Sequence, residues 1–150
     1  MKMKKTTWIW LDCDGTIVDL YGVRDWLPML IASDPTPYAV AAPLVNMSAL
    51  ARRLNRLQGM GYKLGIISWL SKSSTPDYDK AVTSAKLGWL AKHLRSVKWD
   101  AINIVPYGRN KWDVCGEGIL FDDEAPNREA WGGEAFHPDE MMKILSSLAA

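Results

Sequence analysis

The stretch TWIWLDCDGT, residues 7–16, decides the fold of this 150-residue chain. Its first six residues are apolar except at the two ends, and they predict a short buried strand that closes on Asp12. Gly15 then interrupts the pattern and indicates a turn. By itself, the pair Asp14-Gly15 is explained as well by a turn as by a functional site, because Asp and Gly are common turn formers. The rest of the chain has to decide between these two interpretations.

Segments predicted to be strands alternate with segments predicted to be helices along the remaining sequence. Further strands are expected at residues 62–68, 101–105 and 118–122, with a short one near 135–136, and helices at 24–33, 44–58, 79–95 and 138–149. Three prolines, Pro35, Pro37 and Pro43, predict a loop over residues 34–43. This alternation is typical of an α/β domain with a parallel sheet of about five strands.

Polar and charged residues follow several of the predicted strands. Because the carboxyl ends of parallel strands meet at one edge of a sheet, we expect these side chains to converge there. Taken singly, each has a plainer explanation as a turn residue, a helix cap, a loop hydroxyl or a solvated lysine. Their joint occurrence in this order favours a functional site. The residues are Asp12 and Asp14 after the first strand, Ser68 after the second, Lys111 after the third, and Asp122 and Asp123 after the fourth.

This grouping of acids predicts a magnesium site. Several carboxylates held close together repel one another, and a bound cation removes the repulsion. A small number of hard oxygen ligands, shared with a substrate phosphate, suits Mg²⁺. The sequence does not favour zinc, since His93 and His137 lie far apart and neither Cys13 nor Cys115 belongs to a CxxC pair.

Four segments resemble the motifs of the haloacid dehalogenase (HAD) superfamily of phosphohydrolases. Residues 12–16, DCDGT, resemble the first motif, DxDGT, and residues 66–68, IIS, are similar to the second. Lys111 resembles the lone basic residue of the third motif, and residues 119–123, ILFDD, resemble the fourth. The motifs run from residue 8 to residue 123 and so cover most of the chain. The resemblance implies a three-layer α/β/α Rossmann-like fold in one domain, residues 1–150.

The resemblance also implies a reaction. Asp12 would attack phosphorus and become an aspartyl phosphate, which divides one difficult displacement into two. Asp14 would protonate the leaving oxygen and then deprotonate the water that hydrolyses the intermediate. In this superfamily the second Asp marks phosphatases and phosphotransferases, whereas dehalogenases lack it. We therefore expect a phosphatase rather than a dehalogenase.

The remaining motif residues would bind the metal and the phosphoryl group. The resemblance implies that Mg²⁺ is held by the Asp12 carboxylate, the Asp14 backbone carbonyl and Asp122. Asp123 would ligate through water or orient the basic residue of the third motif. That basic residue, Lys111, would balance the charge of the phosphoryl oxygens, with Arg109 two residues earlier as the alternative. Ser68 would hydrogen-bond the same oxygens.

The intervals between the motifs leave little room for a cap domain, so we expect an open site with residues 20–43 as a minimal cap or flap. Open sites in the superfamily tend to serve macromolecular substrates, and residues 110–124 have a limited likeness to the 5′-nucleotidase branch. The expected substrates are therefore phosphomonoesters of nucleotides or of nucleic-acid ends. The candidate substrate-binding residues are Thr16, Trp69 and Arg109, with Trp26 as a second ring for stacking and Arg24 and Lys72 at the rim.

Composition adds weaker expectations. Eighteen basic and seventeen acidic residues give a net charge of +1, which provides no global argument for binding nucleic acid or acidic lipid. Two cysteines suggest free thiols in a reducing cytoplasm. The apolar run after the basic start, residues 1–5, is too short for an export signal, and no stretch is long enough to span a membrane. An open site and eight tryptophans are compatible with a homodimer.

Two other functions remain open at this point. The chain could be a catalytically idle relative that binds a partner or a phosphorylated ligand, although the intact Asp12, Asp14, Ser68 and Asp122 count against this. It could also be a phosphotransferase that passes the phosphoryl group to an acceptor other than water.

Overall fold

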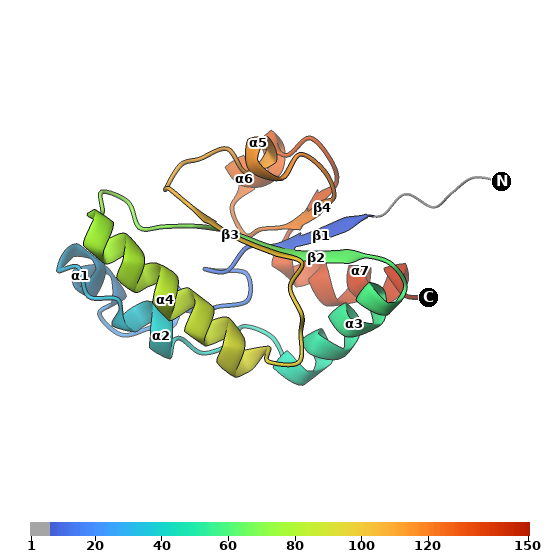
Figure 1. The fold of residues 1–150 in the computed structure, drawn as a ribbon, viewed down its shortest axis with the longest axis horizontal. Coiled ribbons are helices and arrows are strands. Elements are labelled where there is room, and N and C mark those ends of the chain that lie inside the picture. Colours follow the sequence, from blue (N-terminus) through green and yellow to red (C-terminus); the bar gives the residue numbers. More distant parts are fainter. Residues whose placement is uncertain (1–6) are drawn as a thin grey trace.

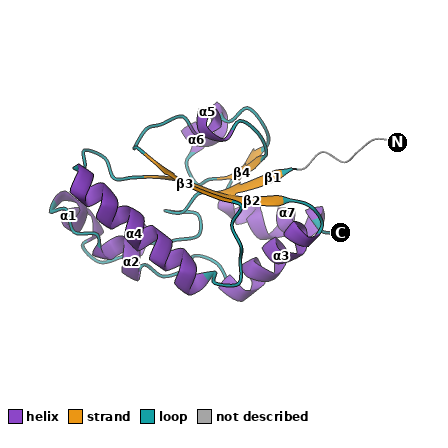
Figure 2. Cartoon of the chain, viewed as in Figure 1, coloured by secondary structure: helices purple, strands orange, loops and turns teal. Residues whose placement is uncertain are grey.

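The computed structural model describes residues 7–150, and its centre is a sheet of five parallel strands (Figure 1, Figure 2). The strands lie in the order β3-β2-β1-β4-β5. This confirms the predicted α/β class and the parallel sheet. Residues 1–6, which hold the basic start considered for an export signal, lie outside the described residues. The strands are β1 (Trp8–Leu11), β2 (Lys63–Trp69), β3 (Ala101–Val105), β4 (Ile119–Phe121) and β5 (Ala135–Phe136).

Helices cover both faces of the sheet and complete the three layers (Figure 1). One face is covered by α3 (Met47–Gly59), α4 (Pro76–His93) and α7 (Met141–Leu148), and the other by α5 (Lys111–Cys115) and α6 (Ala125–Ala130). Two short helices, α1 (Trp26–Ile31) and α2 (Thr36–Val40), follow β1, and α2 packs against α4. The 3-10 helices are η1 (Leu20–Gly22) and η2 (Pro138–Glu140).

Strand alternation determines which layer each site residue faces. Leu11 joins the larger core, beneath α3, α4 and α7, whereas Trp10 joins the smaller core on the side of α5 and α6. Successive side chains of a strand point to opposite faces. Asp12, two residues after Trp10, therefore projects toward the α5 layer. Ser68, two residues after Ile66 of the larger core, projects toward the α4 layer.

The structure corrects the expectation of a loop over residues 34–43. This segment contains α2, and Pro37 lies in its first turn. Proline is compatible with that position because the first amide groups of a helix have no partner within the helix. The segment after β3 likewise holds a helix, α5, which begins at Lys111 after the Asn110 side chain caps the Asp113 amide at 3.1 Å. Short helices of this kind carry too few residues for a periodic sequence signal.

Two predicted helices begin at capping residues rather than where the apolar pattern starts. Asn46 accepts a hydrogen bond from the Ala49 amide at 2.9 Å, so α3 begins at Met47 and not at residue 44. Thr75 accepts from the Tyr78 amide at 3.2 Å, so α4 begins three residues earlier than residue 79. Three tryptophans of the two cores find backbone acceptors for their indole N–H groups, as buried indoles require; they are Trp10, Trp89 and Trp131.

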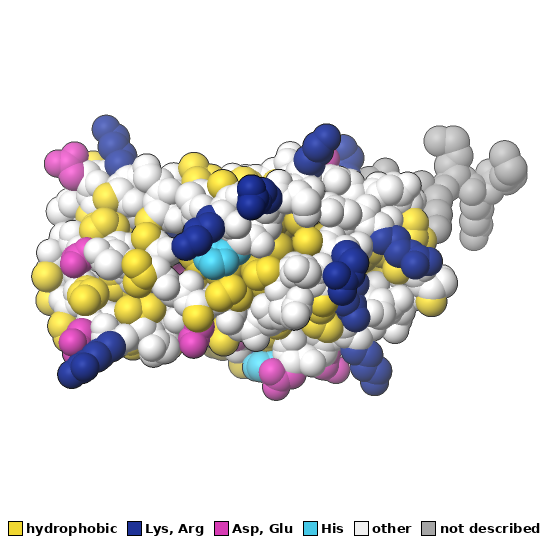
Figure 3. Space-filling view, turned by 90° about the horizontal axis from the view of Figure 1, so that it is seen from below, with side chains coloured by type: hydrophobic (Ala, Val, Ile, Leu, Met, Phe, Trp, Pro, Cys, Tyr) yellow, Lys and Arg dark blue, Asp and Glu magenta, His cyan; other side chains and the backbone are white. Residues whose placement is uncertain are grey.

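The face formed by α3, α4 and α7 carries lysines and arginines that are spread among hydrophobic and acidic side chains (Figure 3). This distribution agrees with the net charge of +1. Among the described residues, no helix has both the length and the apolar composition needed to cross a bilayer.

Candidate active site

Asp12 lies directly after β1 and is nearly buried, with 6% of its surface exposed. Lys111 Nζ donates to Asp12 Oδ1 at 2.9 Å, and Thr16 Oγ1 donates to Asp12 Oδ2 at 3.1 Å. Lys111 also donates to Asp122 Oδ2 at 2.7 Å. Burial acts to lower the pKa of Lys111, but Asp12 and Asp122 raise this pKa by more, so the ammonium group stays charged.

The pairing of β1 with β4 brings these acids together. Leu11 lies opposite Phe121 in the register, so Asp12 and Asp122, the next residues, lie side by side on the same face. Asp123 completes a group of three carboxylates that each have an oxygen within 4.8 Å of the others. Gly15 makes this approach possible, because a Cβ atom there would collide with the Asp123 carboxylate.

The three carboxylates fit a magnesium ion. Burial, followed by the charge of Asp12, raises the pKa of Asp122 to about 6 and that of Asp123 to about 8. The part of these pKa shifts that comes from Asp12 reflects a repulsion that a cation would remove. The donors are all hard oxygen atoms, and one of the three acids is the candidate nucleophile, so the set matches the preference of Mg²⁺ for few carboxylates shared with a phosphate.

Asp14 faces the opposite layer and pairs with a residue that the sequence analysis missed. Lys86 Nζ of α4 donates to Asp14 Oδ2 at 2.7 Å. The other oxygen, Asp14 Oδ1, is buried and has no hydrogen-bond partner among residues 7–150. Burial raises the pKa of Asp14, although the charge of Lys86 opposes the shift. A carboxyl group whose pKa is raised holds a proton more readily, as a general acid must.

Lys86 also reaches Ser68, the residue of the second motif. Its Nζ donates to Ser68 Oγ at 2.8 Å and lies 4.8 Å from the centre of the Tyr38 ring. Lys86 is 3% exposed and Ser68 is fully buried. A sequence signal for Lys86 did exist, because it lies between Val82 and Trp89 on the apolar stripe of α4. A lysine on such a stripe needs a buried partner.

The other predicted residues take different places. Thr16 is fully buried and binds Asp12, so it lies below the nucleophile rather than in the open cleft. Trp69 lines the cleft, and its indole N–H donates to the backbone oxygen of Arg109 at 2.8 Å. The Arg109 side chain is exposed and does not line the cleft, whereas Lys111 does. The roles proposed for these residues stay predictions.

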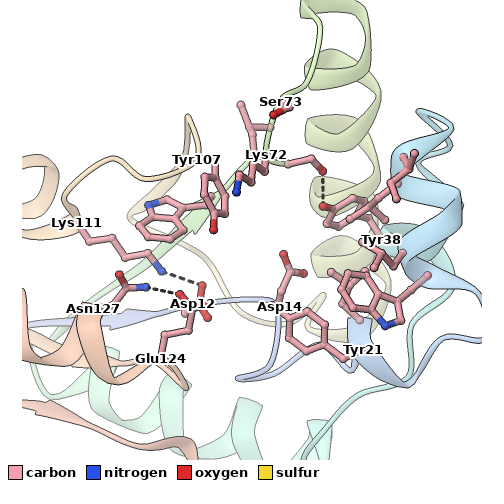
Figure 4. A pocket seen from close by; sticks show the side chains of 18 residues that line it. Asp12, Asp14, Tyr21, Tyr38, Lys72, Ser73, Tyr107, Lys111, Glu124 and Asn127 are labelled. Atoms are coloured by element: carbon pink, nitrogen blue, oxygen red, sulfur yellow. Dashed lines mark hydrogen bonds and ion pairs between the residues drawn. The ribbon is translucent and has the colours of Figure 1, made fainter.

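A cleft of about 440 Å³ opens above the aspartates (Figure 4). Asp12, Asp14 and Lys111 lie at its base. Its walls are formed mostly by aromatic and aliphatic side chains from the ends of β2 and β3 and from the segment after β1. They include Tyr21, Trp26, Leu27, Leu30, Ile31, Tyr38, Trp69 and Tyr107.

The chain resembles a solved structure over nearly its whole length. That structure is the crystal structure of D,D-heptose 1,7-bisphosphate phosphatase from Burkholderia thailandensis. The TM-score is 0.59, the sequence identity is 12%, and the match covers 97% of this chain and 99% of that chain. The chain shares the three-layer α/β/α fold of this phosphatase. At this identity the likeness concerns the fold alone, and neither a protein-family model nor a curated protein matches the sequence significantly.

Proposed function

We propose that this protein is a Mg²⁺-dependent phosphatase that hydrolyses phosphomonoesters through an aspartyl-phosphate intermediate on Asp12. The observation that carries the proposal is the pair of aspartates at the base of one cleft. Asp12 is held by a charged lysine, and Asp14 carries a buried oxygen with no hydrogen-bond partner in the described part of the chain. The shared HAD fold supports phosphohydrolase chemistry, because the solved relative is itself a phosphatase.

The proposed reaction has two steps. A carboxylate oxygen of Asp12 attacks phosphorus, the bond from phosphorus to the leaving oxygen breaks, and Asp14 gives that oxygen a proton. Asp14 then takes a proton from water, the water oxygen attacks the aspartyl phosphate, and Asp12 and inorganic phosphate are released. Ser68 and Lys111 would bind the phosphoryl oxygens during both steps.

The ion would be held by Asp12, Asp122 and the backbone carbonyl of Asp14, with Asp123 acting directly or through water. When bound, Mg²⁺ supplies positive charge that offsets the repulsion between the carboxylates and the anionic substrate. Lys111 lies between Asp12 and Asp122 and contributes charge of the same sign at the same place. Lys111 and a bound ion would therefore both supply positive charge to one cluster of acids.

The substrates proposed from the sequence are nucleotides or nucleic-acid ends. An open site would accommodate such substrates. In agreement with a minimal flap, residues 20–43 form only two short helices and a 3-10 turn beside the cleft. Trp69 and Trp26 both line the cleft and are available for stacking against a ring.

The test measures Mg²⁺-dependent phosphate release from p-nitrophenyl phosphate by the wild type and by Asp12→Asn, with Asp139→Asn as control. Asp139 has a side chain that is 90% exposed, so its substitution leaves the site intact. We expect Asp12→Asn to lose at least about a thousandfold in kcat/KM. Equal, negligible turnover by wild type and Asp12→Asn would instead identify an idle binding protein.

A second measurement addresses the intermediate. Asp14→Asn cannot activate water, so with an aryl phosphate that needs no proton on its leaving group we expect phosphate to accumulate on Asp12. Intact mass after acid quenching detects this, and peptide mapping locates it. Product analysis with added alcohols or nucleosides distinguishes hydrolysis from phosphotransfer.

A further inference from the structure

Helix α1 presents apolar side chains to the cleft, and of these Leu30 also packs against the small buried cluster of Leu20, Tyr38, Tyr78 and Val82. None of the α1 residues is buried, and Leu27 and Ile31 are 49% and 77% exposed. Trp26, Leu27, Leu30 and Ile31 all line the cleft. Exposed apolar surface gathered at one place indicates a binding surface.

Aromatic rings form both walls of the same cleft. Trp69 and Tyr107, at the ends of β2 and β3, form one pair with ring centres 5.1 Å apart. Tyr21 and Trp26 form the other pair, with ring centres 5.0 Å apart. Figure 4 shows Tyr107 on one side of Asp14 and Tyr21 on the other. Tyr107 is 52% exposed and therefore has a ring face available to a ligand.

The charges of the cleft fit one phosphoryl group better than a polyanion. Among the described residues that line it, the cations are Lys72 and Lys111, and Lys111 is already bound to two aspartates. Glu124 adds a negative charge at the rim. Proteins that bind nucleic-acid strands line the path of the backbone with several basic residues, and this cleft does not.

Resting on the proposed phosphatase function, we propose that the cleft binds the leaving group of a small phosphomonoester and that this group carries a flat ring. The ring lies between the Trp69–Tyr107 pair and the α1 side, where stacking and apolar contact stabilise it, while the phosphate reaches Asp12. A nucleoside monophosphate and an aryl phosphate both have this chemistry. A sugar phosphate without a ring of this kind does not.

A matched pair of ligands tests the ring directly. Adenosine 5′-monophosphate and ribose 5-phosphate share the phosphate and the ribose and differ in the base alone. We expect the nucleotide to bind about fivefold to a hundredfold more tightly than ribose 5-phosphate. The dissociation constants are measured on Asp12→Asn in the presence of Mg²⁺. Two further ligands are measured in the same way: phenyl phosphate, as an aryl phosphate without a sugar, and a 5′-phosphorylated oligonucleotide, as a polymeric substrate.

Tyr107→Leu should remove most of this preference, and Tyr62→Leu, a tyrosine at the opposite end of the strands, should leave it unchanged. Equal affinity for the nucleotide, phenyl phosphate and ribose 5-phosphate would overturn the proposal, as would tighter binding of the oligonucleotide than of the nucleotide. Because the readout is binding, these outcomes are distinct from a loss of the phosphatase function, which is measured by phosphate release.

A separate observation concerns Lys86. Lysine can donate hydrogen bonds but not accept them, so both Asp14 Oδ2 and Ser68 Oγ must act as acceptors toward it. Asp14 Oδ1 is then the oxygen left free to carry the catalytic proton. The single O–H of Ser68 is not used in the contact with Lys86, and the Cys13 thiol lies within its reach.

We infer that Lys86 is a positioning residue of the proposed reaction, which orients Asp14 and Ser68 together from α4. Lys86 would affect the rate through the proton that Asp14 delivers to the leaving oxygen. The effect of Lys86 on the rate should therefore be largest when that oxygen is strongly basic. Substrates whose leaving group departs as a stable anion need no proton and should be affected least.

The test compares Lys86→Met with wild type across aryl phosphates whose leaving phenols span a range of pKa. We expect the loss in kcat/KM, which reports formation of the aspartyl phosphate and not its hydrolysis, to grow with the pKa of the phenol, from about threefold to about a hundredfold, in the direction shown by Asp14→Asn. Lys80→Met, an exposed lysine of the same helix, is the control. If Lys86→Met does not fold, Lys86→Gln keeps a donor without the charge and is tested in the same way.

A loss that is uniform across the series would overturn this role and leave Lys86 with a purely structural one. Turnover by wild type that does not depend on Asp12 would contradict the phosphatase function itself, and the role of Lys86 with it. The two failures are therefore distinguishable.

Discussion

Lys111 and Lys86 reach the two aspartates of the first motif from opposite faces of the sheet. Lys111 begins α5 and binds Asp12, whereas Lys86 lies in α4 and binds Asp14. Helices α5 and α4 lie on opposite faces of the sheet (Figure 1). Both are almost fully buried, at 4% and 3% exposure. Strand alternation directs Asp12 and Ser68 to different layers, and Asp14, which lies beyond the end of β1, faces the layer of Ser68.

The difference between the two lysines lies in their second partners. Lys111 joins Asp12 to Asp122, and both of these acids are candidate metal ligands. Lys86 joins Asp14 to a neutral hydroxyl, Ser68. A metal ion could therefore compensate for the loss of Lys111, but it has no means of compensating for the loss of Lys86.

The largest expected effect is the loss of phosphatase activity when Lys111 is replaced. Lys111→Met removes a charged donor from the proposed phosphoryl site, and we expect kcat/KM to fall by about a hundredfold to a thousandfold. Steady-state kinetics with saturating Mg²⁺ measure this, with the exposed Lys98→Met as control. Unchanged kcat/KM would mean that another cation, such as Arg109, serves the phosphate.

The next effect is on folding. Each substitution leaves a buried carboxylate without its partner, so we expect Lys111→Met and Lys86→Met each to lose about 3 kcal/mol of unfolding free energy without metal. Mg²⁺ should restore stability to Lys111→Met and not to Lys86→Met. Urea unfolding with and without Mg²⁺ decides this, and equal recovery of both variants would contradict the comparison.

A smaller effect is the pH dependence of stability. The pKa of Asp123 rises from about 4 in an unfolded chain to about 8 in the folded protein, because burial and Asp12 disfavour its charge. The folded state thus binds the Asp123 proton more tightly than the unfolded chain does. The stabilisation that this proton gives the folded state is fully present below about pH 4, and it is lost as the pH rises through about 8. Mg²⁺ removes the repulsion. We therefore expect Mg²⁺ to raise Tm more at about pH 9 than at about pH 6.

Asp123→Asn should flatten this pH dependence, whereas Glu129→Gln, a change at an exposed acid, should leave it as in wild type. Thermal unfolding at several pH values, with and without Mg²⁺, provides the comparison. A Mg²⁺ effect that is the same at every pH would show that the acids are already ionised in the metal-free protein.

The smallest effect concerns the α1 side of the cleft. Because Ile31 is 77% exposed, Ile31→Ser should change the unfolding free energy by no more than about 0.5 kcal/mol. It should nevertheless raise KM for ring-bearing substrates by about twofold to fivefold, since it removes apolar contact. A large loss of stability would show that α1 belongs to the core.

Much of the site could be predicted from the sequence, because the motif residues follow strands. The carboxyl ends of parallel strands meet at one edge, so the convergence of Asp12, Ser68 and Asp122 needed only the strand assignments. Two short helices, α2 and α5, were not predicted, because five residues carry no readable period and their prolines and caps resemble loop signals.

By itself, the sequence determined the α/β fold with a parallel sheet and the residues at the strand ends, since hydrophobic runs and turns specify such a sheet locally. Only the tertiary structure decided the partners of the two aspartates. Lys86 is 72 residues from Asp14 in the chain, and its position on the apolar stripe of α4 shows that it is buried but not what it meets. That contact depends on how α4 packs beneath β2, and side-chain packing between distant elements leaves no pattern in a single sequence.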